Sequence, residues 1–140
     1  MLYCKRKNST NWQFPQGGID KNEDIFDAAL RELYEEVGIE ENKVKLIKES
    51  DNWYKYDLPK KYKRNSFLWE SFKGQKQKWF LFKLIEETKI DLNNENNPEF
   101  DEFNWVDYWK PLDEIVDFKR EIYEKVLTEL EPAYKSEFSE

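Results

Sequence analysis

The chain has no histidine, and this absence removes several classes of catalytic site. A Ser-His-Asp triad and a Cys-His pair both require histidine, and the usual zinc sites require histidine or several cysteines. Acid and base chemistry in this protein must therefore be carried by carboxylates, tyrosines or lysines.

Cysteine is nearly absent as well, because Cys4 is the only one in 140 residues. An internal disulfide is excluded, which suits a reducing compartment, and we expect Cys4 to be a buried thiol rather than a reactive one. No apolar run approaches the roughly 20 residues of a membrane span, and the first residues, Met1–Lys5, lack a signal-peptide pattern. We expect a cytoplasmic protein with no membrane partner.

Aromatic and charged residues are abundant, at 17% and 38% of the chain. The aromatic residues supply apolar area for one core, and the length fits a single domain over residues 1–140. The net charge is −7, which argues against binding to duplex DNA, yet residues 55–78 hold eight basic and two acidic residues, a net +6. This basic segment is either a solvated face or a phosphate-binding surface.

Strands and two long helices are predicted along the chain, which indicates an α/β fold. The first helix is expected over Asp24–Val37, with Asn22 as its N-cap and Gly38 as a left-handed residue just after its end. A second helix follows Pro111, with apolar residues at spacings of three and four: Ile115, Phe118, Ile122, Val126 and Leu130. Strands are expected at Leu2–Lys5, Val44–Ile47, Trp53–Leu58, Lys78–Leu84 and Phe103–Val106.

The first helix has one acidic edge, because Glu32, Glu35 and Glu36 fall within roughly one third of its circumference. Like charges at these spacings repel by a few tenths of a kcal/mol per pair unless a cation or an arginine compensates. Magnesium would compensate well, since it prefers carboxylate oxygens and accepts phosphates as further ligands. The alternative is an exposed face of an acidic protein.

The surrounding pattern favours the metal site. The chain matches G-x5-E-x7-R-E-U-x-E-E-x-G-U, where U is bulky and apolar, at every fixed position: Gly17, Glu23, Arg31, Glu32, Leu33, Glu35, Glu36, Gly38 and Ile39. This segment resembles a complete Nudix box, and nine constrained positions in 23 residues are far more specific than a lone glycine motif.

The Nudix resemblance implies an α/β/α sandwich with a mixed sheet and a metal-dependent hydrolysis of a phosphoanhydride bond. It implies that Glu32, Glu35 and Glu36 bind Mg²⁺, with Mn²⁺ as a possible substitute, and that Glu35 or Glu36 is a candidate base. Gly17 would offer a backbone carbonyl to the metal. Glu23 and Arg31 would hold the loop to the helix, and Gly38 would end the helix.

Further motifs narrow the resemblance to one branch of the family. Four segments and one pair of residues carry it: Trp12–Gly18, Gly74–Phe80, Pro98–Asp101, Phe118–Arg120 and Trp105-Val106. They are similar to RNA pyrophosphohydrolases and to dinucleoside polyphosphate hydrolases of bacteria and plants. In that branch the glutamate of the Pro-Glu-Phe-Asp motif reaches the metal site, so Glu99 is a fourth carboxylate, as ligand or base.

The same branch implies the substrate contacts. The segment Gly74–Phe80 would be a strand whose successive residues face opposite sides, so one pair, Lys76 with Lys78 or Gln75 with Gln77, would line the phosphate cleft. Lys119 would add a cation near the substrate. Tyr56, Val116 and Phe118 match positions that hold the bases, although Phe118 also fits the apolar periodicity of the last helix.

One departure from this branch concerns the start of the chain. Members begin about twenty residues earlier with an extra strand, so the first strand is expected to be missing or truncated here, which would leave an exposed sheet edge.

The leading functional hypothesis is removal of pyrophosphate, or of phosphate stepwise, from a 5′-triphosphorylated or diphosphorylated RNA end. The nearest rival is the asymmetrical cleavage of diadenosine tetraphosphate. A third hypothesis is a truncated, inactive module that binds nucleotide or an unknown protein partner.

Overall fold

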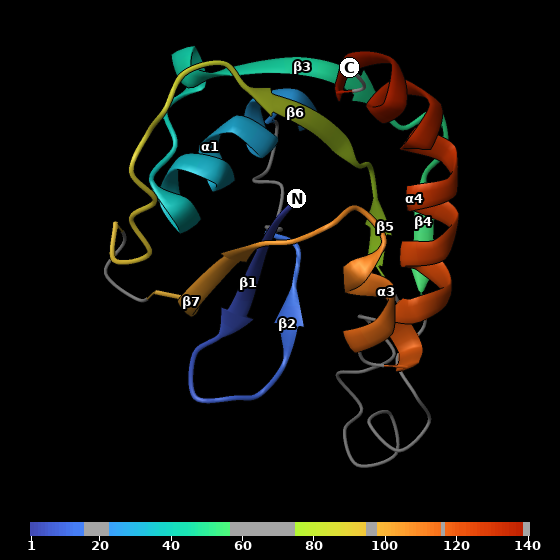
Figure 1. Cartoon of the computed structure of the whole chain (residues 1–140), viewed down its shortest axis with the longest axis horizontal. Helices are drawn as coiled ribbons and strands as arrows, with labels where there is room; N and C mark the ends of the chain where they lie inside the picture. Colours follow the sequence, from blue (N-terminus) through green and yellow to red (C-terminus); the bar gives the residue numbers. More distant parts are fainter. Residues whose placement is uncertain (16–22, 57–74, 95–97, 116, 139–140) are drawn as a thin grey trace.

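The computed structural model describes residues 1–15, 23–56, 75–94, 98–115 and 117–138. One helix, α1 (Ile25–Val37), packs against strands from two small sheets, and a long helix, α4 (Asp117–Phe138), stands on the other side of the molecule (Figure 1). A short helix, α3 (Lys110–Glu114), leads into α4, and a single 3-10 turn, η1 (Glu41–Lys43), follows α1. No helix within the described ranges is long and apolar enough to cross a membrane.

The strands of the described ranges pair in three antiparallel groups. In the first, β1 lies between β2 and β7; in the second, β3 pairs with β6; in the third, β4 pairs with β5. The strands are β1 (Leu2–Arg6), β2 (Trp12–Gln13), β3 (Val44–Glu49), β4 (Tyr54–Tyr56), β5 (Gln75–Gln77), β6 (Phe80–Leu84) and β7 (Phe100–Trp105).

The β3–β6 pair and the β2–β1–β7 sheet do not join through strand pairing in the described part of the chain. Strand β6 pairs with β3 along one edge, and its second edge has no strand partner among the described residues. The parallel pairing that makes a sheet mixed is likewise not found among these described strands.

The caps of α1 set the position of its acidic edge. The N-cap is Asp24 and not Asn22, because the Asp24 carboxylate accepts hydrogen bonds from the backbone N–H groups of Phe26 (3.0 Å) and Asp27 (3.3 Å). Gly38 ends the helix as predicted, with φ of 74° and its N–H donated to the Tyr34 carbonyl. A Cβ at Gly38 would lie 2.8 Å from the Cβ of Asp91, so close packing also requires glycine there.

In the described part of the chain, three hydrophobic clusters form the core and place α1 and α4. Beneath α1, Cys4 (0% exposed) packs with Val37, Ile39 and Phe100, which confirms the expected buried thiol. On the other side, the predicted apolar stripe of α4 is buried at Ile122, Val126 and Leu130, and these side chains pack on Tyr54 and Leu81. The third cluster lies around Tyr3, Phe14 and Tyr123.

The strand predicted at Lys78–Leu84 begins two residues later, as β6 at Phe80, and Gln75–Gln77 form the separate strand β5, so Lys78 and Trp79 lie outside both. The backbone at Trp79 bonds instead to Ser50: the Ser50 N–H donates to the Trp79 carbonyl (2.7 Å), and the Trp79 N–H donates to the Ser50 hydroxyl (3.0 Å). These hydrogen bonds hold Trp79, between the two strands, against Ser50.

Candidate functional site

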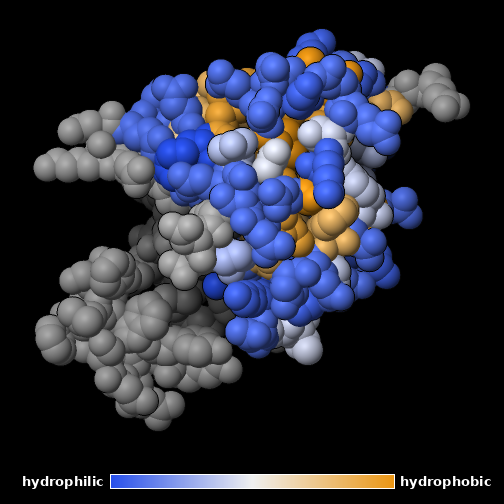
Figure 2. Space-filling model, turned by 90° about the vertical axis from the view of Figure 1, so that its left-hand side faces the viewer, coloured by the Kyte–Doolittle hydropathy of each residue, from blue (hydrophilic) through white to orange (hydrophobic). Residues whose placement is uncertain are grey.

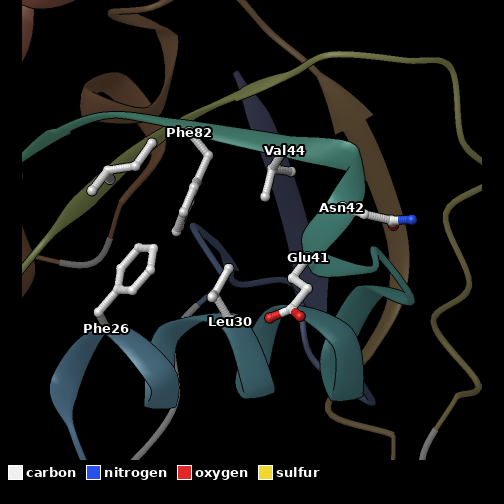
Figure 3. A pocket seen from close by; sticks show the side chains of 7 residues that line it. Phe26, Leu30, Glu41, Asn42, Val44 and Phe82 are labelled. Carbon is white, nitrogen blue, oxygen red and sulfur yellow. The ribbon is translucent and has the colours of Figure 1, made fainter.

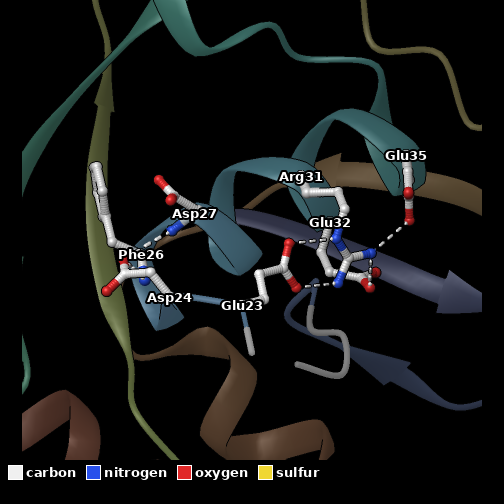
Figure 4. Close-up of polar contacts among 7 residues, drawn as sticks. All are labelled: Glu23, Asp24, Phe26, Asp27, Arg31, Glu32 and Glu35. Atoms are coloured by element: carbon white, nitrogen blue, oxygen red, sulfur yellow. Dashed lines mark hydrogen bonds and ion pairs between the residues drawn. The ribbon is translucent and has the colours of Figure 1, made fainter. Parts of the chain in front are cut away.

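Arg31 is the centre of the polar contacts on α1 (Figure 4). Its Nε and Nη2 donate to the two carboxylate oxygens of Glu23, at 2.8 and 2.9 Å, in a bidentate pair. Its Nη1 donates to Glu32 (2.7 Å) and Glu35 (3.1 Å). Arg31 therefore ties Glu23, the residue before the N-cap, to the helix itself and also neutralises part of the acidic edge.

Glu36 differs from its two acidic neighbours because it is buried, with 2% of its surface exposed. Burial raises the pKa of the Cys4 thiol to about 12, and the negative charge of Glu36 makes a smaller contribution to the same rise. An ionised carboxylate in such a place costs several kcal/mol unless it is neutralised. A cation bound beside Glu36 would remove that cost.

The charge of Glu99 acts on the carboxyl group of Glu32 although the two residues come from different elements. Burial raises the pKa of Glu32, the contact with Arg31 opposes that effect, and the charges of Glu35 and Glu99 raise it further. Glu99 is exposed just before β7, and its carbonyl accepts the N–H of Lys7 (2.8 Å). The structure thus brings the fourth predicted carboxylate into electrostatic range of the helix.

The predicted ligands fit a hard divalent ion, since their side chains offer carboxylate oxygens and one of these side chains, Glu36, is buried. Among the described residues, however, no three aspartate, glutamate or cysteine side chains lie close enough together to hold a metal ion. Two of the predicted ligands, Glu32 and Glu35, bind Arg31 instead. Gly17, the predicted carbonyl ligand, lies outside the described residues.

Lys119 near the start of α4 is held by a residue that the motif did not single out. Its Nζ donates to Gln13 Oε1 at 3.1 Å, and burial, with a smaller contribution from Arg6, lowers the pKa of Lys119. Gln13 is 2% exposed, and its Nε2 has no hydrogen-bond partner among the described residues. A polar residue in the Trp12–Gly18 motif was the only sequence signal for this role.

The adjoining residue is also fixed by α4. The backbone N–H of Phe14 donates to the hydroxyl of Tyr123 (3.0 Å), and the two rings stack with centroids 5.0 Å apart. Helix α4 therefore anchors residues 13–14, which precede Gly17 by a few residues.

Lys78 makes contacts that differ from the predicted phosphate contact. Its Nζ donates to the carbonyl of Ser50 (2.7 Å) and lies 5.7 Å from the ring centroid of Trp53. These contacts stabilise the loop before β4, and phosphate binding by Lys78 stays a prediction.

The remaining predicted substrate residues are placed by backbone only or not at all. In the β4–β5 pair, Tyr56 is opposite Gln75 and Lys55 is opposite Lys76. Gln77 lies at the end of β5 and Phe118 in the first turn of α4, and the side chains of Tyr56, Gln75, Lys76, Gln77 and Phe118 lie outside the described set. Val116 is outside the described residues altogether.

An apolar cavity of about 350 Å³ lies beside α1, away from its acidic edge (Figure 3). Leu30, one of its lining residues, is about 200° around the helix from Glu32. The side of the molecule that carries α1 shows apolar side chains among mostly hydrophilic ones (Figure 2). The other lining residues are Phe26, Glu41, Asn42, Val44, Leu46 and Phe82.

Comparison with known proteins identifies the family. The model of the NUDIX domain matches residues 1–126, and the chain therefore belongs to the Nudix family. It is similar to proteins named RNA pyrophosphohydrolase from Haemophilus ducreyi (45% identity over 130 residues), Aliivibrio fischeri (44% over 133) and Francisella tularensis subsp. mediasiatica (47% over 129). Each alignment covers 91–92% of this chain, and the three cover 66%, 76% and 82% of the relatives. The chain thus spans about two thirds of the length of the Haemophilus protein.

Solved structures agree in fold. The Escherichia coli dihydroneopterin triphosphate pyrophosphohydrolase superimposes with a TM-score of 0.68 at 20% identity, over 91% of this chain and 84% of that one. A Caenorhabditis elegans Ap4A hydrolase gives 0.63 at 18%, over 94% and 86%. The predicted Nudix family and the α/β Nudix fold are confirmed, and the predicted branch agrees with the name of these relatives, RNA pyrophosphohydrolase. Dependence on a divalent metal is general among Nudix hydrolases.

Proposed function

We propose that the protein is a metal-dependent RNA 5′-pyrophosphohydrolase that converts a 5′-triphosphorylated RNA end into a 5′-monophosphorylated one. The observation that carries the proposal is the 44–47% identity, over more than nine tenths of the chain, to proteins named RNA pyrophosphohydrolase. The full acidic edge of α1 supports it, because Arg31 and the caps hold that edge in place.

The metal proposed is magnesium, with manganese as a substitute. Glu32, Glu35 and Glu36 would hold it, together with Glu99 and the backbone carbonyl of Gly17. When bound, the metal lowers the pKa of a coordinated water and neutralises charge on the phosphate oxygens. The burial of Glu36 supports this assignment, since a buried carboxylate is stabilised by a cation.

In the proposed reaction, a water oxygen attacks phosphorus, the phosphoanhydride P–O bond breaks, and pyrophosphate leaves with the bonding electrons. A carboxylate oxygen of Glu35, Glu36 or Glu99 would take the proton from that water. Lys119 would neutralise charge on the substrate phosphates, since it lies where α4 contacts residues 13–14, shortly before Gly17. The bases would contact Tyr56, Val116 and Phe118, and the phosphates would contact Gln75, Lys76, Gln77 and Lys78.

Turnover of two substrates by the same preparation tests the proposal. A 5′-triphosphorylated oligonucleotide should yield pyrophosphate and a monophosphorylated end in magnesium, and the same oligonucleotide with a 5′-hydroxyl serves as the control. Diadenosine tetraphosphate is offered in parallel. Consumption of the dinucleotide alone would contradict an RNA pyrophosphohydrolase, and failure to hydrolyse either substrate would favour a binding module.

A further inference from the structure

Glu129, in the middle of α4, receives hydrogen bonds from three residues of one short stretch of chain about 75 residues earlier. The backbone N–H of Asp51 donates to Glu129 Oε2 at 2.8 Å, and Asn52 Nδ2 donates to Oε1 at 3.0 Å. The hydroxyl of Tyr54 also donates to Oε1. One carboxylate therefore fastens the loop before β4, and the first residue of β4, to the helix.

The other side of this loop is fastened to the start of β6. Lys78 Nζ donates to the Ser50 carbonyl at 2.7 Å, and Ser50 exchanges hydrogen bonds with the backbone of Trp79. The loop is thus held between α4 and the chain that leaves β5. Among these contacts, those of Glu129 connect the β4–β5 pair to α4.

The chemical state of Glu129 fits this role. Burial would raise the pKa of its carboxyl, but the hydrogen bonds from Tyr54, Asp51 and Asn52 outweigh it and lower the pKa below its ordinary value. The group is therefore an ionised acceptor, and hydrogen bonds to an ionised acceptor are stronger than those between neutral groups. Tyr54 is itself buried, packed on Val126 and Leu130 of the same helix.

The direction of β4 links this anchor to the substrate site. From Tyr54, β4 runs along α4 toward the end of the helix that carries Lys119 (Figure 1). Lys119 precedes Glu129 by ten residues, or about 15 Å along a helix. Movement of the loop at Glu129 would shift the β4–β5 pair relative to Lys119.

We propose that Glu129 is a positioning residue for substrate binding, which sets the β4–β5 pair at a fixed place relative to Lys119 so that single-stranded RNA is held between them. This inference rests on the proposed function. It predicts that Glu129 affects the binding of an oligonucleotide and leaves the chemical step at the carboxylates of α1 unchanged.

Glu129→Gln and Glu129→Ala test the proposal against Glu124→Gln, which removes the same charge from the same helix. With a 5′-triphosphorylated oligonucleotide, KM should rise about fivefold for Glu129→Gln and tenfold or more for Glu129→Ala, with kcat within about twofold of the parent chain, as for lost uniform binding. Glu124→Gln should leave both constants unchanged. Hydrogen exchange at the Asp51 amide should become faster in Glu129→Ala, because its acceptor is removed.

Three results would overturn the positioning role: an unchanged KM in both variants, a fall in kcat as large as the rise in KM, or an equal effect in Glu124→Gln. The dissociation constant of the oligonucleotide, measured without metal, separates this inference from the proposed function. A parent chain that binds the oligonucleotide but does not hydrolyse it would refute the proposed function alone. The ratio of the dissociation constants of the Glu129 variants to that of the parent chain would then decide the role of Glu129. A parent chain that does neither would refute both.

Discussion

The side-chain oxygen of Gln13 accepts a hydrogen bond of 3.1 Å from the ammonium of Lys119, 106 residues further along the chain. Gln13 is buried at the end of β2, and Lys119 lies near the start of α4. This contact joins the segment just before Gly17 to helix α4, which carries Lys119, the cation predicted to lie near the substrate.

We expect Gln13→Leu to destabilise the protein by about 1–3 kcal/mol, because the partly buried ammonium of Lys119 loses an acceptor. Urea unfolding measures the change. Lys119→Met should be non-additive with Gln13→Leu, so that the double variant is more stable than the sum of the two single changes predicts. Strict additivity would show that the contact contributes nothing.

Arg31→Lys should lower both stability and activity although it keeps the charge. Lysine cannot form the bidentate pair that Arg31 makes with Glu23, and it cannot also reach Glu32 and Glu35. We expect a loss of about 1–2 kcal/mol in urea unfolding. Glu23→Gln, which breaks the same pair from the other side, should have a similar effect on stability, and a much smaller one would place the importance of Arg31 in its contacts to Glu32 and Glu35.

Glu36→Gln should abolish hydrolysis at saturating magnesium while the far-ultraviolet circular dichroism stays unchanged. Without metal the variant should unfold at the same temperature as the parent chain or a higher one, because an amide is less costly to bury than a carboxylate. Added magnesium should raise the melting temperature of the parent chain and not that of the variant, since only a ligand bound to the folded state stabilises it. An equal rise in both chains would remove Glu36 from the metal site.

The acid stability of the protein should depend on Glu129. Its folded pKa is lowered by the hydrogen bonds from Tyr54, Asp51 and Asn52, which outweigh burial, so the unfolded chain binds more protons in the window from about pH 4.5 down to the folded pKa. The stability that Glu129 contributes is present above that window and is lost as the pH falls through it. Urea unfolding between pH 6 and pH 3 should show a shallower decline for Glu129→Gln than for Glu124→Gln, and equal slopes would contradict the assignment.

Local features of the sequence predicted the site helix well. The spacing of apolar residues fixes the face that α1 buries, and Gly38 occupies the left-handed position at its end. The N-cap was predicted two residues early because Asn22 and Asp24 are both good caps, and only the hydrogen bonds of Asp24 decide between them.

Contacts between distant parts of the chain were not predictable in the same way. Nothing near Glu129 in the sequence indicates a loop 75 residues earlier as its partner. Arg31 binds two of the predicted metal ligands, and the pattern alone allowed either a cation or an arginine to compensate their charge. Strand pairing was also open, because period-two alternation specifies a strand but not its neighbour.

The pairing of β1 with β7 constrains how the chain folds as it is synthesised. Leu2 is opposite Trp105, and the backbone N–H of Val106 donates to the Met1 carbonyl at 2.8 Å. At about 5–20 residues per second, β1 waits on the order of 5–20 seconds for its partner to be made. Contacts so far apart in sequence also predict slow refolding, because a long loop must close before they form.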